Sequence, residues 1–306
     1  MATSSGGRYR HPSSEDLLRK VEQAQEQEQQ RLDGDVNDFL QRLLARFNDR
    51  DIDASQRRLA DIERVLGEEV EVDRMLLGGS VAKHTDVDGI SDVDALVILR
   101  REELAGRSAR ELLDYFFESL NQALPRSEVT AVDKGRLAVT VRYRDGSEIQ
   151  LLPALRSRQL IQIAAADGQG WNDTKPKVFQ RELTAANVRL NRGLVPAIKL
   201  IKSIVSDFPS QKQITGYHIE ALAVEAAAGY RGPSTPKALL IHVLGFAAQR
   251  VLAPMKDKTG QSRTVDAYLG TANSIERRNI SQALEGMKRR LEAATTVAQW
   301  RAVFGE

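Results

Sequence analysis

The sequence predicts an α+β fold, in which a mixed β-sheet with helices occupies the first half and helices alone occupy the second half. Short apolar runs with strand character, such as residues 95–99, are confined to the part of the chain before about residue 160. From residue 184 onward, apolar residues recur at helical spacing. At 306 residues the chain is long enough for one bilobal unit or two domains.

The first part of the chain, residues 14–170, is expected to combine N-terminal helices with the sheet. Residues 1–13 contain Ser and Gly in a low-complexity pattern and are expected to be disordered. A cap at residues 14–16 predicts a helix through the Gln/Glu-rich segment 16–31, and further helices are predicted over residues 36–47, 54–66 and 108–124. Strands are predicted over residues 70–77, 95–99, 129–132, 137–143 and 148–152. The turn Asp145-Gly146 is expected to join the last two strands as a hairpin.

The second part, residues 171–306, is expected to form a helical domain. Helices are predicted over residues 184–206, 217–229, 235–252 and 274–294, and residues 253–260 are expected to form a polar loop. We find no internal repeat in either part.

The composition excludes several classes of protein. Lys and Arg number 44 against 42 Asp and Glu, and this balance gives no general case for nucleic-acid binding. The absence of cysteine excludes disulfides, thiolate zinc sites and cysteine catalysis. The four histidines do not have the spacing of metal ligands. No apolar run approaches the length of a membrane span, so we expect a soluble cytoplasmic protein.

The most informative motif is a Gly-Gly-Ser turn at residues 78–80, followed by Asp92 and Asp94 at the start of an apolar run. Because side chains alternate along a strand, the two aspartates are expected on one face, close enough to hold divalent cations. Two such carboxylates are electrostatically costly unless a cation or a buried partner compensates them. The turn offers backbone N–H groups and the Ser80 hydroxyl to a phosphate chain. Together these features predict a metal-dependent nucleotidyl transfer site.

A third carboxylate is a common part of two-metal transfer sites. The candidate strand is residues 148–152, on which Glu148 and Gln150 share a face. The amide oxygen of Gln150 is a neutral and weaker cation ligand than an aspartate, so Glu148 is the candidate for the third charge. An exposed hairpin glutamate explains Glu148 equally well, and the two interpretations stay open.

Three polar residues of the predicted helical domain are candidates for substrate contacts. Lys199 and Lys202 lie three apart on one face of an apolar helix, where they would either neutralise a triphosphate or extend to solvent. Tyr217, at the start of the next helix, would be either a platform for a base or a core aromatic residue.

The Gly-Gly-Ser turn and the acidic pair at residues 92 and 94 resemble the signature of the DNA polymerase beta-like nucleotidyltransferases. Four further segments make the chain similar to the CD-NTase group, which contains the oligonucleotide cyclases of bacterial CBASS anti-phage systems and relatives of oligoadenylate synthase and cyclic GMP–AMP synthase. These segments are residues 151–154, 198–202, 216–220 and 257–260. The resemblance covers about residues 35–295.

The resemblance implies a nucleotidyltransferase core packed against a C-terminal helical domain, with nucleotides held in a central cleft. It implies that Asp92 and Asp94, with Glu148 as the third candidate, bind Mg²⁺ or, in its place, Mn²⁺. The residues then expected to contact substrate are Gly79, Ser80, Lys83, Gln150, Lys199, Lys202, Thr215 and Tyr217. Relatives usually carry aspartate at the position of Gln150 and often serine at that of Gly216, so either Thr215 substitutes for the serine or its phosphate contact is lost.

The implied function is synthesis of a cyclic di- or trinucleotide second messenger from NTPs, ATP among them, with release of pyrophosphate. The alternatives are a linear oligoadenylate synthase, an RNA-directed nucleotidyltransferase, and a catalytically weakened nucleotide-binding homologue, which Gln150 motivates. The group implies CBASS effector or regulatory proteins as partners. Without cysteine the chain lacks the zinc insertion of animal cyclic GMP–AMP synthases, so no direct DNA sensing is expected. We expect a monomer.

Overall fold

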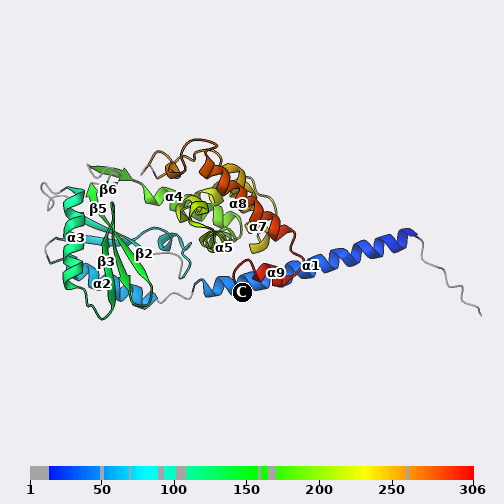
Figure 1. Ribbon diagram of the computed structural model, residues 1–306, viewed down its shortest axis with the longest axis horizontal. Coiled ribbons are helices and arrows are strands. Elements are labelled where there is room, and N and C mark those ends of the chain that lie inside the picture. Colours follow the sequence, from blue (N-terminus) through cyan, green and yellow to red (C-terminus); the bar gives the residue numbers. More distant parts are fainter. Residues whose placement is uncertain are drawn as a thin grey trace, which may run out of the picture.

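The computed structural model describes residues 14–48, 52–68, 70–88, 93–100, 108–157, 160–164, 170–259 and 262–306. Within these ranges, a seven-stranded sheet with two helices occupies one end of the molecule, and a group of helices occupies the other (Figure 1). The predicted α+β class is confirmed. The tail expected at residues 1–13 lies outside the described residues.

Helices and strands are mixed along the chain as far as β7, and the elements described after β7 are helices. The helices are α1 (Ser14–Arg46), α2 (Ile52–Leu66), α3 (Ala109–Ala123), α4 (Pro176–Arg189), α5 (Leu194–Ser206), α6 (Gly216–Ala227), α7 (Pro236–Arg250), α8 (Ile275–Glu292) and α9 (Val297–Arg301). The strands are β1 (Val72–Leu77), β2 (Val93–Arg100), β3 (Val129–Lys134), β4 (Val139–Tyr143), β5 (Glu148–Ser157), β6 (Leu160–Ala164) and β7 (Trp171–Thr174). A short 3₁₀ turn, η1 (Val81–Lys83), follows β1. We call α2 to β7 the sheet half, and α1 with α4 to α9 the helical half.

The sheet is mixed, and its register places the predicted site strands side by side. Its main strand order is β1-β2-β5-β4-β3, and β6 and β7 extend it from β5. Strands β2 and β5 run parallel, whereas β1 and β4 are antiparallel to their neighbours. In the parallel pair, the Cα partner of Asp94 is Gln150. Two polar residues of the predicted site therefore occupy adjacent positions in the middle of the sheet.

Strand alternation decides which side chains of β2 enter the core. Its alternate residues Val93, Ala95, Val97 and Leu99 pack into one apolar cluster with residues of α2 and α3. Because successive side chains point to opposite faces, Asp94 lies on the other face, away from these two helices. The carboxylate thus avoids the apolar core of the sheet half.

The helical half has its own apolar core, which includes the C-terminal part of α1. Val36, Phe39, Leu40, Leu43 and Leu44 of α1 are buried with residues of α4 to α8. In contrast, the side chains described before Leu32 on this helix are exposed. Figure 1 shows this N-terminal part of α1, in blue, extending well beyond the rest of the molecule.

Three predictions of secondary structure were wrong in detail. The helices predicted over residues 16–31 and 36–47 form the single helix α1. The segment 184–206 is divided between α4 and α5, because Asn191 and Arg192 adopt left-handed backbone conformations with φ of 50° and 63°. Strands β6 and β7 were not predicted; β6 pairs with β5, β7 pairs with β6, and β7 ends at Thr174.

Among the residues that the structure describes, no helix combines the length and the hydrophobicity that a bilayer span requires.

Candidate active site

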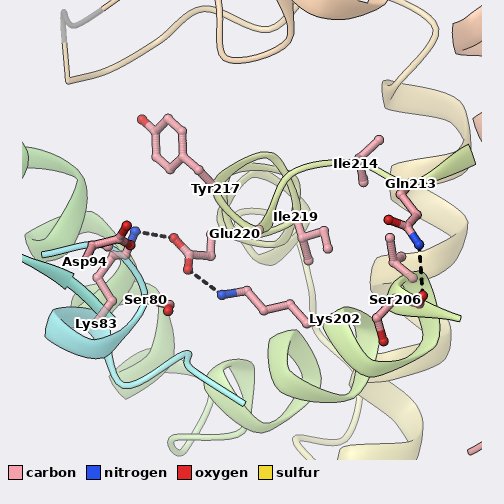
Figure 2. Close-up of a pocket in the computed structure, with 13 residues that line it drawn as sticks. Ser80, Lys83, Asp94, Lys202, Ser206, Gln213, Ile214, Tyr217, Ile219 and Glu220 are labelled. Carbon is pink, nitrogen blue, oxygen red and sulfur yellow. Dashed lines mark hydrogen bonds and ion pairs between the residues drawn. The ribbon is translucent and has the colours of Figure 1, made fainter. Parts of the chain in front are cut away.

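A cavity of about 370 Å³ lies between the turn after β1 and the first turns of α6 (Figure 2). Both halves of the molecule contribute to its walls. From the sheet half come Gly79, Ser80, Lys83 and Asp94; from the helical half come Lys202, Val205, Ser206, Gln213, Ile214, Gly216, Tyr217, Ile219 and Glu220. Six of the residues predicted from sequence therefore meet at one cavity or at its edge: Gly79, Ser80, Lys83, Asp94, Lys202 and Tyr217.

The Gly-Gly-Ser turn folds directly over Asp94. The Gly78 N–H donates a hydrogen bond of 2.7 Å to the Asp94 carbonyl oxygen. Gly79 has a positive φ of 50°, and a Cβ atom added there would lie 1.6 Å from Asp94 Oδ2. Only glycine allows the carboxylate to lie this close to the turn. The backbone and the Asp94 side chain are therefore fitted to each other at the cavity wall.

An ion cluster links the two halves across the cavity. Glu220 is 1% exposed, and its Oε2 lies 2.5 Å from Lys83 Nζ. Its Oε1 accepts hydrogen bonds from Lys202 Nζ at 2.9 Å and from the hydroxyl of Thr85. Lys202 Nζ also donates to the Thr85 carbonyl oxygen at 3.0 Å. Figure 2 shows Glu220 between the two lysines, with Tyr217 one turn away on the same helix.

Burial and charge act against each other in this cluster. Burial alone would raise the pKa of Glu220, but the charges of Lys202 and Lys83 outweigh it, and the pKa lies below its ordinary value. Burial lowers the pKa of Lys202, and Glu220 opposes that change. The carboxylate therefore stays ionised, and it favours the charged form of the neighbouring ammonium.

Tyr217 is half-buried and held from two sides. Its hydroxyl donates a hydrogen bond of 2.8 Å to Asp257 Oδ1, and the Phe179 ring meets it edge-on at a centroid distance of 5.0 Å. Lys83 Nζ lies 5.3 Å from its ring centroid, within cation–π range. Burial and the bond to Asp257 raise the pKa of the Tyr217 hydroxyl. The ring is thus positioned as a platform at the edge of the cavity.

The start of α6 leaves little room for a side chain at position 216. The Thr215 hydroxyl accepts a hydrogen bond from the His218 N–H and caps the helix, and Thr215 does not line the cavity. A Cβ atom at Gly216 would lie 3.2 Å from Lys202 Cε and 3.4 Å from its Nζ. In this chain, the Lys202 side chain therefore packs closely against the position where a serine side chain would begin.

Lys199 points to a different part of the molecule from Lys202. Lys199 Nζ donates to Asn48 Oδ1 at 2.6 Å and lies 3.9 Å from Asp86 Oδ1. It lines a separate, mostly apolar cavity of about 620 Å³ behind the Gly-Gly-Ser turn. The two lysines are separated because Lys202 faces Thr85 while Lys199 faces the end of α1.

The remaining predicted residues lie outside the cavity or outside the described chain. Arg142 Nε donates to Glu148 Oε1 at 2.6 Å, and neither Glu148 nor Gln150 lines the cavity. Asp92 lies outside the described residues. No group of three or more His, Cys, Asp or Glu side chains arranged to hold a metal is found in the part of the chain that the structure describes.

The donor chemistry around Asp94 nevertheless fits a hard cation. Asp94 presents carboxylate oxygens at the cavity, and its strand partner Gln150 shares its side of the sheet. Oxygen donors of this kind suit Mg²⁺, whereas the carboxylate of Glu148 is paired with Arg142, which also contacts Asp133.

Sequence reasoning missed the role of Glu220 and Asp257. An acidic residue among Ile219, Ala221 and Leu222 of an apolar helix was the available signal for Glu220, since such a charge requires a buried partner. The pattern Asp-x-Thr at residues 257–259 was the signal for Asp257, because Asp257 accepts hydrogen bonds from both the N–H and the hydroxyl of Thr259.

The mixed sheet, with Asp94 of β2 held against the Gly-Gly-Ser turn, is the arrangement expected of a polymerase β-like nucleotidyltransferase. A model of the Second Messenger Oligonucleotide or Dinucleotide Synthetase domain matches residues 31–187, which is more than half of the chain. The chain belongs to this family of CD-NTases. A comparison with curated proteins finds no match.

Solved CD-NTase structures share the fold at low sequence identity. The CD-NTase CdnG of Bradyrhizobium diazoefficiens, in complex with GTP, is 17% identical with a TM-score of 0.63, and the match covers 81% of this chain and 88% of that one. The E. coli MS115-1 complex of CdnC with HORMA-deltaN is 17% identical with a TM-score of 0.61, and the match covers 86% of this chain and 96% of that one. The Vibrio cholerae DncV cyclic AMP–GMP synthase, in complex with a linear intermediate, is 12% identical with a TM-score of 0.59. That match covers 76% of this chain and 67% of the DncV chain.

Proposed function

We propose that this protein joins ribonucleoside triphosphates, ATP among them, into a cyclic di- or trinucleotide and releases pyrophosphate. The observation that carries the proposal is a single cavity that places Asp94 and the Gly-Gly-Ser turn opposite Lys202 and Tyr217. Membership of a family of oligonucleotide or dinucleotide synthetases supports the same reaction class.

The polar groups of the cavity match the parts of a nucleoside triphosphate. Ser80 and the backbone of the Gly-Gly-Ser turn would bind the phosphate chain, because N–H and O–H donors suit phosphate oxygens. Lys83 and Lys202 would neutralise its charge, and Tyr217 would stack on a base. With these contacts, catalysis consists of positioning and charge neutralisation, and no covalent intermediate on the protein is needed.

We further propose that Asp94, together with Asp92, holds Mg²⁺ at the start of β2, with Mn²⁺ as the alternative ion. When bound, the ion would lower the pKa of the attacking ribose hydroxyl and offset charge on the leaving pyrophosphate. Asp94 itself would orient the ion from the rigid strand, and Gly79 would keep the carboxylate against the phosphate-binding turn. Glu148 remains a proposed third ligand that would first have to leave Arg142.

A role in CBASS anti-phage signalling is proposed from family membership. One solved relative is a complex of CdnC with HORMA-deltaN. We accordingly propose that effector or regulatory proteins of this kind are partners, that the protein acts in the cytoplasm, and that the enzyme is a monomer.

The test is incubation of the protein with the four NTPs and Mg²⁺, followed by mass spectrometry and phosphatase treatment of the products. A cyclic product resists phosphatase because it has no terminal phosphate, whereas a linear product loses its terminal phosphates. We expect Asp94→Asn to abolish product and pyrophosphate release while the protein keeps its circular dichroism spectrum. The matched control is Glu118→Gln, an exposed acid on α3, which should retain parent activity. Pyrophosphate release by Asp94→Asn at the parent rate would refute the proposal.

A second candidate function is a nucleotide-binding protein with a weakened site, favoured by the neutral amide of Gln150 beside Asp94 in the sheet. The test is Gln150→Asp, assayed with its parent for product at increasing Mg²⁺. Product from Gln150→Asp and none from the parent would establish the weakened site. Product from the parent would exclude it.

A further inference from the structure

We infer that Glu220 is a positioning residue of the nucleotide cavity: it holds Lys83 and Lys202 side by side and thereby sets the affinity for the triphosphate. The inference rests on the proposed function, because it assumes that the two lysines bind phosphate. Glu220 would not touch the substrate itself. Through the two lysines, it would set the strength and the pH dependence of triphosphate binding.

The carboxylate of Glu220 forms ion pairs with two lysines that lie on different elements. Lys83 follows β1 on η1, Lys202 lies on α5, and Glu220 lies on α6. The Glu220 oxygens are shared between them, with Oε2 at 2.5 Å from Lys83 Nζ and Oε1 at 2.9 Å from Lys202 Nζ. Each ammonium is therefore located by the same acid, and Figure 2 shows this arrangement at the wall of the cavity.

Burial makes the carboxylate necessary. The Lys202 side chain is 5% exposed, that of Lys83 is 12% exposed, and that of Glu220 is 1% exposed. Two ammonium groups this far removed from water repel each other strongly unless an anion lies between them. Thr85, two residues after η1, supports the cluster: its hydroxyl donates a hydrogen bond to Glu220 and its carbonyl oxygen accepts one from Lys202. Without the acid, the lysines would move apart or lose a proton.

The charged state of Lys202 depends on the charged groups of α6, of η1 and of the segment that follows η1. Burial lowers the pKa of Lys202, Glu220 raises it, Lys83 lowers it further, and Asp86 raises it. Removal of the Glu220 charge therefore lowers the pKa of Lys202. Because a lysine loses its positive charge as the pH rises through its pKa, the loss of phosphate affinity should be greatest at alkaline pH.

The experiment measures binding of a non-hydrolysable ATP analogue with Mg²⁺ to the full chain by calorimetry at pH 6.5, 7.5 and 8.5. For Glu220→Gln we expect a Kd at least tenfold weaker than that of the parent at pH 8.5, and a smaller difference at pH 6.5. The matched control is Glu225→Gln on the same helix, which removes an exposed ion pair with Arg250 away from this cavity. It should bind like the parent at every pH.

Two further variants separate positioning from a merely structural role. Glu220→Asp keeps the charge but withdraws the carboxylate by one methylene, so we expect weaker binding at all three pH values and the pH profile of the parent. In Glu220→Gln combined with Lys202→Gln, the added pH dependence should disappear, because the titrating group is gone. If Glu220→Gln does not fold, as judged by thermal unfolding, Glu220→Asp decides the matter, and parent affinity in that variant would overturn the inference.

The outcomes distinguish this inference from the proposed function. If the parent binds the analogue and Glu220→Gln binds it equally at each pH, the inference falls and the proposed function stands. If the parent binds no analogue, both fall. A lower melting temperature in Glu220→Gln with unchanged affinity would assign Glu220 a structural role only, and it would also overturn the inference.

Discussion

At the scale of single residues, the fit between Gly79 and Asp94 is the most demanding feature of the site. The backbone of Gly79 is in the left-handed region, and the Asp94 carboxylate occupies the space where a side chain at position 79 would begin. Gly146 provides a comparison within the same chain, since it also has a positive φ, of 84°, but has nothing within 4 Å of its added Cβ. The two glycines share the conformational requirement and differ in the contact.

We predict that Gly79→Ala loses product formation, because the new methyl group must displace the Asp94 carboxylate or open the turn. Gly146→Ala, which tests the backbone conformation alone, should cost about 1–2 kcal/mol of unfolding free energy and leave activity unchanged. Gly79→Ala should cost at least as much. Urea unfolding and the NTP assay measure the two effects, and full activity in Gly79→Ala would contradict the assigned role of the turn.

At the scale of elements, the start of α6 rests on a buried network around His218. His218 is fully buried, its Nδ1 lies 3.1 Å from the Tyr268 hydroxyl oxygen, and its Nε2 lies 3.7 Å from Asp266 Oδ2. Arg277, also fully buried, donates to Asp266 at 2.7 Å and to the Val251 carbonyl oxygen at 2.8 Å. This network anchors α6, which carries Tyr217 and Glu220, to the loop before α8.

We predict that stability falls as the pH decreases from about 6.5 to 4. Burial lowers the pKa of His218 to about 4, with Arg277 adding to the effect and Asp266 opposing it. The unfolded chain, in which the histidine pKa is near 6.5, therefore takes up the proton first, and the loss is on the order of 3 kcal/mol. His218→Phe cannot take up this proton, so its unfolding free energy should change less over the same range. Urea unfolding at several pH values measures this, and equal slopes would contradict the prediction.

At the scale of the whole molecule, α1 divides into a part that belongs to the core and a part that does not. Leu40 is 0% exposed within the core of the helical half, whereas Leu18 on the same helix is 63% exposed. Lys237, at the start of α7, ties the two elements together, since its N–H donates to Asn37 Oδ1 at 3.0 Å. The C-terminal part of α1 is thus a structural member of the helical half.

We predict that Leu40→Ala lowers the unfolding free energy by about 3 kcal/mol, because it leaves a cavity in a packed core. Leu18→Ala, the same substitution on the exposed part of α1, should change it by less than about 0.5 kcal/mol. Thermal or urea unfolding of the two variants beside the parent measures the difference. Similar destabilisation by both would show that the N-terminal part of α1 is packed in solution.

Much of the fold was predictable because its signals are local. The continuous apolar run of β2, the Asp145-Gly146 turn and the apolar periodicity of α6 to α8 each depend on neighbours in sequence. Strands β6 and β7 carry weaker local signals, because they are four or five residues long and take their conformation from pairing, β6 with β5 and β7 with β6. The two lysines of α5 show the same limit: their spacing predicted a shared face, but in the folded chain Lys202 bonds to Thr85 after η1 and Lys199 bonds to Asn48 after α1.

The amino-acid order by itself determined the α+β class, the turn beside Asp94 and the family, because residue type and short-range spacing encode these directly. Tertiary structure alone decided that Glu220 forms ion pairs with both Lys83 and Lys202. It likewise decided the ion pair of Arg142 with Glu148 and the hydrogen bond from Tyr217 to Asp257. The residues of each pair are between 6 and 137 positions apart along the chain, yet they are in contact in space. The strength of an ion pair depends on the distance between its charges in space and on their burial, and both are set only when the chain is folded.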